Sequence, residues 1–261
     1  MINTLNKHVK WRRDRENILI CDCKRMVDLK LPIRFLDFIE KIWKGVDKQS
    51  LNNVENKIFS DFEKMKLLSN LEIRKIKEKE FSPAMNILDN ELGKERVRNK
   101  AFLYKKFKEF PNLFLGIFLD NELAGLVCGF PRQDYLLMSE LAVDFRFQKR
   151  GFGKKLVKAF EETTKKLKYK KINVGADDSA IKFYKSLNYK PFLLIQYKKG
   201  ESLSKDFKES KEFKITKESE DNAYTLLETN INKNEYTLEN LKKLRKKYPK
   251  AFFQYIFTKQ L

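Results

Sequence analysis

The chain contains little glycine, proline, cysteine or histidine. Its 261 residues include nine glycines, six prolines, three cysteines and one histidine. An odd number of cysteines argues against a disulfide framework, and Cys21 and Cys23 lack both the usual zinc-ligand spacing and a partner pair. With His8 as the only histidine, neither a metal site nor a histidine-activated nucleophile is expected. These shortages predict a reduced, cytoplasmic protein that binds no metal.

Long hydrophobic runs are also missing. No stretch approaches the roughly 20 apolar residues of a membrane span. The first residues, MINTLNKHVKWRRDREN, contain no apolar segment of the kind found in export signals, so neither a membrane nor export is expected. Apolar residues nevertheless make up 42% of the chain, and 22 are phenylalanine. A packed core is therefore expected, in one large domain or in two or three small ones.

The net charge is +20, and the excess is largest over residues 71–200, with 28 basic and 16 acidic side chains. A basic field raises the association rate of anionic ligands such as nucleic acid, acidic surfaces or nucleotide-like cofactors. Solvated faces filled with lysine explain the same excess equally well. The charge alone leaves both interpretations open.

Apolar spacing and turn residues divide the chain into three segments. In residues 1–68 we predict a strand at 17–22, a helix that begins at Pro32 and stops near Gly45, and a helix at 54–68. In residues 71–200 strands and helices alternate. Strands are predicted at 71–76, 135–143, 171–176 and 192–198, a hairpin at 113–130 with its turn at Asn121-Glu122, and helices at 81–92 with Pro83 in the first turn, 95–110, 153–167 and 179–187.

The third segment, 201–261, begins with a charged linker at 201–210. Strands are predicted at 212–217, 223–229 and 251–258, with a helix at 238–247. This pattern indicates a small α/β extension. Its last strand, AFFQYIFT, is too apolar for a free tail, so we expect it to complete a sheet or to bury against a second subunit in a homodimer.

Two of the few glycines stand one residue apart, in QKRGFG at 148–153. They lie between a predicted buried strand and a predicted helix, whose first turn has unpaired backbone N–H groups and favours an anion. Glycine also lets the backbone approach a phosphate closely. Lys149, Arg150 and Lys154 add positive charge. The stretch satisfies neither the dinucleotide-binding nor the Walker A pattern, so it predicts a different pyrophosphate cradle or, alternatively, an ordinary glycine-rich helix start.

In its motifs and in the order of its elements, the segment at about 71–199 resembles the GNAT superfamily of acetyl-CoA-dependent N-acyltransferases. QKRGFG matches the family pattern Q/R-x-x-G-x-G/A. DDSAIKFYKSLNYKPF matches a second pattern, N-x-x-A-x-x-x-Y-x-x-x-G-F, with Ala180 and Tyr184 in place. Asp177, Asn188 and Tyr189 replace the usual Asn, Gly and Phe, which weakens the expected contacts of that helix with coenzyme A.

The resemblance implies an α/β (α+β) fold with a mixed central sheet flanked by helices, and direct acetyl transfer to an amine. Tyr184 is implied as the general acid that protonates the leaving thiolate, and Glu140 as the general base. Each of the two also fits a structural role, in the core or on the surface. The implied donor-binding residues are Leu141, Ala142, Val143, Gln148, Lys149, Arg150, Gly151, Phe152, Gly153, Lys154 and Asp177.

The implied acceptor is a small-molecule or peptide amine of unidentified structure. Residues 8–68 have a weaker resemblance to PqqD-like and winged-helix peptide-binding modules. DNA binding by this segment is less favoured, because its helix interleaves acidic residues with basic ones. A helical extension that packs on the catalytic domain or on a second subunit explains the segment equally well. We therefore expect an N-terminal module at 1–68, the GNAT domain at 71–200 and the extension at 201–261. Two alternatives stay open: a non-catalytic GNAT-fold protein that binds coenzyme A or peptide, and a nucleic-acid-binding regulator.

Overall fold

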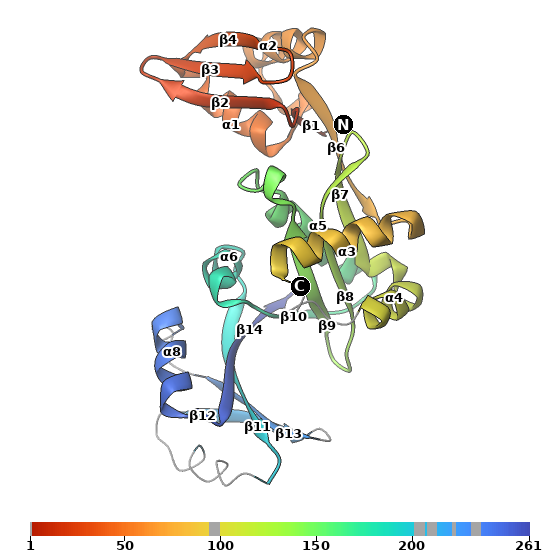
Figure 1. The fold of residues 1–261 in the computed structure, drawn as a ribbon, viewed down its shortest axis with the longest axis vertical. Coiled ribbons are helices and arrows are strands. Elements are labelled where there is room, and N and C mark those ends of the chain that lie inside the picture. The colour runs from red at the N-terminus through yellow and green to blue at the C-terminus, as the bar shows by residue number, and fades with distance from the viewer. Residues whose placement is uncertain (1, 94–99, 201–206, 208–212, 221–222, 231–235) are drawn as a thin grey trace. The chain divides into compact units, whose positions relative to one another are not determined.

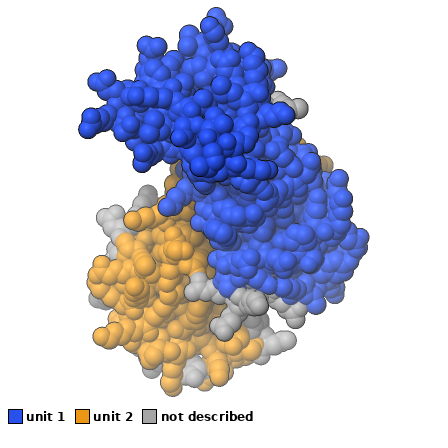
Figure 2. Space-filling model, turned by 45° about the horizontal axis from the view of Figure 1, so that its top comes forward, with its two compact units in different colours: residues 1–129, 140–163 blue, residues 130–139, 164–261 orange. Residues whose placement is uncertain are grey.

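The computed structural model describes residues 2–93, 100–200, 207, 213–220, 223–230 and 236–261. It divides into two compact units, residues 1–129 with 140–163 and residues 130–139 with 164–261 (Figure 2). None of the helices in the described ranges is long and apolar enough to cross a membrane.

Unit 1 can be followed by the labels of its elements in Figure 1. Its strands are β1 (Ile2–Leu5), β2 (Val9–Asp14), β3 (Asn17–Asp22), β4 (Val27–Pro32), β5 (Val46–Asp47), β6 (Leu68–Lys75), β7 (Phe114–Leu119) and all but the end of β8 (Glu122–Pro131). Its helices are α1 (Leu36–Lys44), α2 (Asn53–Lys64), α3 (Glu78–Leu92), α4 (Lys100–Glu109) and most of α5 (Phe152–Lys166), with 3-10 turns η1 (Ile33–Phe35), η2 (Lys48–Ser50), η3 (Pro111–Leu113) and η4 (Phe145–Phe147).

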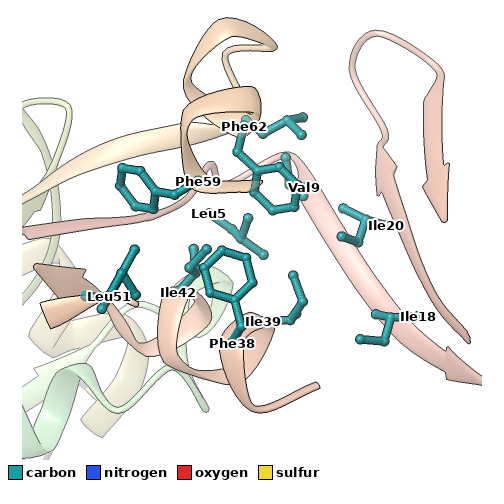
Figure 3. Packing of buried hydrophobic residues seen from close by; sticks show 12 residues of the cluster. Leu5, Val9, Ile18, Ile20, Phe38, Ile39, Ile42, Leu51, Phe59 and Phe62 are labelled. Atoms are coloured by element: carbon teal, nitrogen blue, oxygen red, sulfur yellow. The ribbon is translucent and has the colours of Figure 1, made fainter. Parts of the chain in front are cut away.

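Strands β2, β3 and β4 form a separate antiparallel sheet. One face of this sheet packs against α1 and α2. Figure 3 shows the resulting core, in which side chains of β3 and both helices meet around Leu5 and Val9. Strand β1 pairs with β5 and β6, and β6 pairs in turn with β7. The expected boundary at residues 68–71 therefore falls within a strand, β6, that both segments use.

The second core of unit 1 lies between helices α3 and α4 and strands β7 and β8. Cys128, on β8, is fully buried in it, as its apolar surroundings predict. Turn residues Asp120 and Asn121 have φ values of 47° and 71°. Such values match the hairpin turn that Asn and Asp favour, one residue earlier than expected.

Several helix boundaries differ from the prediction. Helix α1 begins at Leu36, after the 3-10 turn η1, rather than at Pro32. Helix α2 ends at Lys64 rather than at residue 68, because Lys66 has a φ of 54° and the chain then enters β6. Helix α3 begins at Glu78, so Pro83 lies inside the helix and not in its first turn. The Glu80 carboxylate accepts hydrogen bonds from the backbone N–H of Lys77 and from the Arg74 side chain, which fixes this earlier start. Residues 95–99 of the expected basic helix lie outside the described residues.

Unit 2 is built around a mixed sheet. Its elements are the first half of β9 (Leu136–Val143), β10 (Lys171–Gly175), η5 (Asp178–Ala180), α6 (Ile181–Ser186), β11 (Lys190–Lys198), β12 (Lys214–Glu220), β13 (Tyr224–Asn230), α8 (Leu238–Lys247) and β14 (Ala251–Gln260). The strands lie in the order β12-β13-β11-β14-β10-β9, and the described pairs are antiparallel except for β10 and β9, which run parallel. Strand β14 pairs with both β10 and β11. The aromatic C-terminal strand thus completes a sheet, which was one of its two expected roles. The expected linker at 201–210 lies almost entirely outside the described residues.

Candidate donor-binding site

Residues 140–143, the second half of β9, lie beside β8 in unit 1. The backbone N–H of Asp144 donates to the carbonyl oxygen of Ala124 at 3.0 Å. A Cβ atom at Gly125 would lie 2.7 Å from the carbonyl oxygen of Ala142. Because Gly125 has no side chain, the two strands can approach closely here. Ala142 is buried, whereas Glu140, Leu141 and Val143 are half-buried.

Hydrogen bonds and ion pairs among Asp144, Arg146 and Glu122 hold the chain where it leaves β9. The Asp144 carboxylate accepts hydrogen bonds from the backbone N–H of Arg146 at 3.0 Å and from its guanidinium at 2.7 and 2.9 Å. The same guanidinium lies 2.9 Å from the carboxylate of Glu122. Hydrogen bonds from Arg146 hold the pKa of Asp144 below its ordinary value. The turn η4 is therefore held on both sides before the glycine-rich stretch begins.

The side chain of Gln148 ties the start of that stretch to helix α3. Its Nε2 donates to the Glu91 carboxylate at 2.7 Å and to the carbonyl oxygen of Val143 at 3.0 Å. Glu91 also accepts a hydrogen bond from the backbone N–H of Phe145 at 2.8 Å. The sequence prediction missed Glu91. Its one signal in the sequence is a carboxylate in the last turn of a helix, where the helix dipole disfavours negative charge.

We call residues 148–154 the donor loop, after the role that the family resemblance implies for them. Lys149 and Gly151 have φ values of 61° and 74°, which lie in the left-handed region. Among the residues that the structure describes, none accepts a hydrogen bond from the backbone N–H groups of 149–154. Those groups surround the N-terminus of the 15-residue helix α5. The side chains of Lys149 and Lys154 are exposed, and Gly153 is half-buried. Unpaired N–H groups, the helix dipole and exposed lysines all favour an anion at this place.

The Phe152 and Arg150 side chains face the protein interior rather than solvent. Each is 1% exposed. The Phe152 ring stacks on Phe147, with 6.4 Å between centroids. The Arg150 guanidinium donates to Thr4 Oγ1 at 2.8 Å and to the carbonyl oxygen of Leu5. Its side chain therefore lies in the N-terminal segment, whereas the sequence suggested a charge facing the anion. Burial lowers the pKa of Arg150 to about 10.

Tyr184 and Asp177 belong to unit 2. Tyr184 is 5% exposed, and its ring packs against Phe183, Tyr189 and Phe257 with centroid separations of 5.1 to 5.7 Å. Asp177 is exposed. Its carboxylate accepts hydrogen bonds from the backbone N–H and the hydroxyl of Ser179 at 3.0 and 3.1 Å, and so caps η5.

Asn188 explains one departure from the family pattern. Its φ of 62° lies in the left-handed region, which glycine adopts most easily and asparagine tolerates better than most other residues. Asn188 thus preserves the backbone turn that follows α6 although the usual glycine is absent.

The chemistry available on the described residues is that of anion binding and proton transfer. No group of three or more His, Cys, Asp or Glu side chains within the described ranges could hold a metal ion. In unit 1 the structure brings together Glu140, the strand end at 141–143 and the donor loop. A strand end that leads into an anion-binding helix start is an arrangement typical of nucleotide-binding and coenzyme-binding α/β proteins.

Comparison with known proteins identifies the domain. Residues 72–189 match the model of the Acetyltransferase (GNAT) family. No curated protein matches the chain. Among solved structures, Ard1 from Thermoplasma volcanium is 16% identical and covers 62% of this chain and 97% of its own, with a TM-score of 0.38. A GNAT family acetyltransferase from Elizabethkingia anophelis with acetyl-CoA bound is 15% identical and covers 74% of this chain and 99% of its own, with a TM-score of 0.42.

The diaminobutyrate acetyltransferase EctA from Paenibacillus lautus is 9% identical and covers 62% of this chain and 95% of its own, with a TM-score of 0.42. The family match includes the second half of β6, the donor loop and Tyr184. The fold is thus a mixed α/β fold of the acyltransferase class. Residues 72–189 are therefore a domain of the GNAT acetyltransferase superfamily, as the two motifs predict.

Proposed function

We propose that the protein transfers the acetyl group of acetyl-CoA directly to a primary amine. The observation that carries the proposal is the donor loop. In a domain that matches the GNAT family, it has six consecutive residues whose backbone N–H groups make no hydrogen bond to any described residue, at the start of a 15-residue helix. A diphosphate is a ligand whose charge and acceptor oxygens suit such groups.

The donor would lie along the end of β9 and across the loop. Backbone groups of Leu141, Ala142 and Val143 would pair with the pantetheine arm as an added strand does. The loop from Gln148 to Lys154 would hold the diphosphate, mainly through its backbone N–H groups. Exposed Lys149 and Lys154 would add attraction that salt weakens. Asp177 is retained as a donor-binding residue in this proposal, although its carboxylate caps η5.

The transfer itself needs two proton movements. The amine nitrogen attacks the thioester carbonyl carbon, and the carbon–sulfur bond breaks as the thiolate leaves. Glu140 accepts the proton that the amine loses, through a water molecule, and Tyr184 gives its hydroxyl proton to the thiolate. No covalent intermediate on the protein is required, because the amine attacks the thioester directly.

The test is an acetyl-transfer assay with a panel of amines that includes peptide N-termini, lysine side chains, polyamines and amino acids. Loss of the thioester absorbance and mass spectrometry of the products would report transfer. We expect Tyr184→Phe to lower kcat by about 10²-fold or more, with acetyl-CoA affinity unchanged, because only the departing thiolate needs the hydroxyl proton. Transfer by Tyr184→Phe at the wild-type rate would contradict the proposed role of this tyrosine.

A further inference from the structure

Arg150 is the largest fully buried side chain among the described residues. Its guanidinium Nη2 donates to Thr4 Oγ1 and to the Leu5 carbonyl, and its Nε lies 3.4 Å from the carbonyl oxygen of Trp43. The guanidinium also lies 4.3 Å from the centroid of the Trp43 ring. Within the described part of the chain, no carboxylate forms an ion pair with it. A buried cation held only by neutral groups is uncommon, because burial removes the charge from water.

All three hydrogen-bond partners of Arg150 lie outside the family match at 72–189. Thr4 and Leu5 belong to β1, and Trp43 belongs to the last turn of α1. Thr4 Oγ1 itself donates to the Trp43 carbonyl at 3.0 Å. One buried threonine hydroxyl thus connects Arg150, β1 and α1.

The end of α1 makes two further contacts with the loop and with α5. Lys155 Nζ lies 3.4 Å from the carbonyl oxygen of Gly45. The atom nearest to a Cβ built on Gly151 is Cγ of Lys44, at 3.9 Å. Residues 43–45 therefore lie directly beside the loop. Apart from the chain neighbours of Gly151, no other heavy atom of the described residues lies within 4 Å of that Cβ position.

The backbone of the loop needs such support. Lys149 and Gly151, the residues on either side of Arg150, both have left-handed φ values. A lysine rarely adopts this conformation unless the surrounding structure fixes it. Since Arg150 is anchored between these two residues, its buried side chain fixes the direction in which the loop presents its N–H groups.

From these contacts we infer that Arg150 is a positioning residue for donor binding, and that β1 and α1 form a structural part of the donor site. The inference rests on the proposed function, because it assigns the loop to the diphosphate of acetyl-CoA. It gives the N-terminal segment a role in the reaction of the GNAT domain, whatever else that segment binds.

The sharpest test is Thr4→Val in the full chain. Thr4 lies 146 positions from Arg150 in sequence, is fully buried and belongs to β1, so the substitution leaves the donor loop chemically intact. We expect the dissociation constant of acetyl-CoA, measured by calorimetry, to rise about threefold to tenfold, since a hydrogen bond to the buried guanidinium is lost. Arg150→Met should weaken acetyl-CoA binding more than Thr4→Val does. Arg150→Lys should bind acetyl-CoA more tightly than Arg150→Met, because it retains the positive charge.

The matched control is Thr229→Val. Thr229 is a strand threonine of unit 2 that is as fully buried as Thr4. Thermal unfolding of every variant would be recorded beside the titrations. We expect Thr229→Val to lower the unfolding temperature but to bind acetyl-CoA as the wild type does.

Three results would overturn the inference. If the wild type binds acetyl-CoA and Thr4→Val binds it equally well, Arg150 serves packing only and the proposed donor site stands. If both threonine variants weaken binding equally, affinity follows general stability and Arg150 has no positioning role. If the wild type does not bind acetyl-CoA, the inference and the proposed function both fail. Thr4→Val keeps the test decisive if Arg150→Met does not fold.

Discussion

Gly125→Ala should reduce the stability of unit 1. The added Cβ would lie 2.7 Å from the carbonyl oxygen of Ala142 and 3.1 Å from Cα of Val143, both of which are backbone atoms. Neither can rotate away, so β8 and β9 must move apart. Overpacking of this kind costs about 1–3 kcal/mol. The loss of glycine's freedom in the unfolded chain offsets about 0.4–1 kcal/mol of that cost.

We therefore expect a net loss of about 1–2 kcal/mol in the free energy of unfolding, measured by urea titration followed by circular dichroism. Gly175→Ala is the matched control, because a Cβ there meets the amide group of Gln254 at 3.1 Å. That group is the end of a flexible side chain and can yield. We expect this control to remain within about 0.5 kcal/mol of the wild type. The reasoning is refuted if Gly125→Ala is as stable as Gly175→Ala.

Two further predictions concern titratable groups. Hydrogen bonds from Arg74 hold the pKa of Glu80 at about 2, below its ordinary 4.5. The stability that this pair contributes is present above about pH 4.5 and is lost as the pH falls toward 2. Glu80→Gln should therefore lower the free energy of unfolding by about 1–2 kcal/mol at pH 7 and make it depend less on pH between about 4.5 and 2. An unchanged pH dependence in the variant would contradict this. Asp28 accepts a hydrogen bond that raises the pKa of Cys21 to about 12. Iodoacetamide at pH 8 should therefore modify Cys23 before Cys21, and Asp28→Asn should increase the rate at which Cys21 is modified. Equal modification rates of the two cysteines in the wild type would contradict this prediction.

Local patterns predicted most elements of the fold. Strand β3 and helix α8 have the predicted bounds, because alternating or helically spaced apolar residues end at clear polar turns. Strand β1 was missed since it has four residues and is defined by pairing with β5 and β6. Helix α2 was predicted to end at residue 68, beyond its observed end at Lys64, for a similar reason. Its apolar spacing continues past Lys64, and the left-handed Lys66 that ends the helix has no signature in composition.

The glycine-rich turn at 148–153 and the helix that follows it were predictable from the motif, but the direction of the turn's side chains was not. In the sequence, the side chains of Gln148 and Arg150 both look like polar or charged groups that would contact acetyl-CoA. In the structure, Gln148 bonds to Glu91, 57 positions away, and Arg150 bonds to partners 107 to 146 positions away. Such long-range contacts leave no periodic pattern in a single sequence. The roles of Glu140 and Tyr184 follow from the family motif and stay predictions.

Titration of acetyl-CoA into the purified protein, beside Gly151→Trp, tests the central claim most directly. Gly151 has a left-handed φ of 74°, which L side chains rarely adopt, so a tryptophan there would strain the loop backbone and place a large ring beside its N–H groups. The account predicts that the wild type binds acetyl-CoA with a dissociation constant on the order of micromolar and that the variant does not bind. Absence of binding to the wild type, or equal binding to both proteins, would contradict the claim that this loop holds the donor.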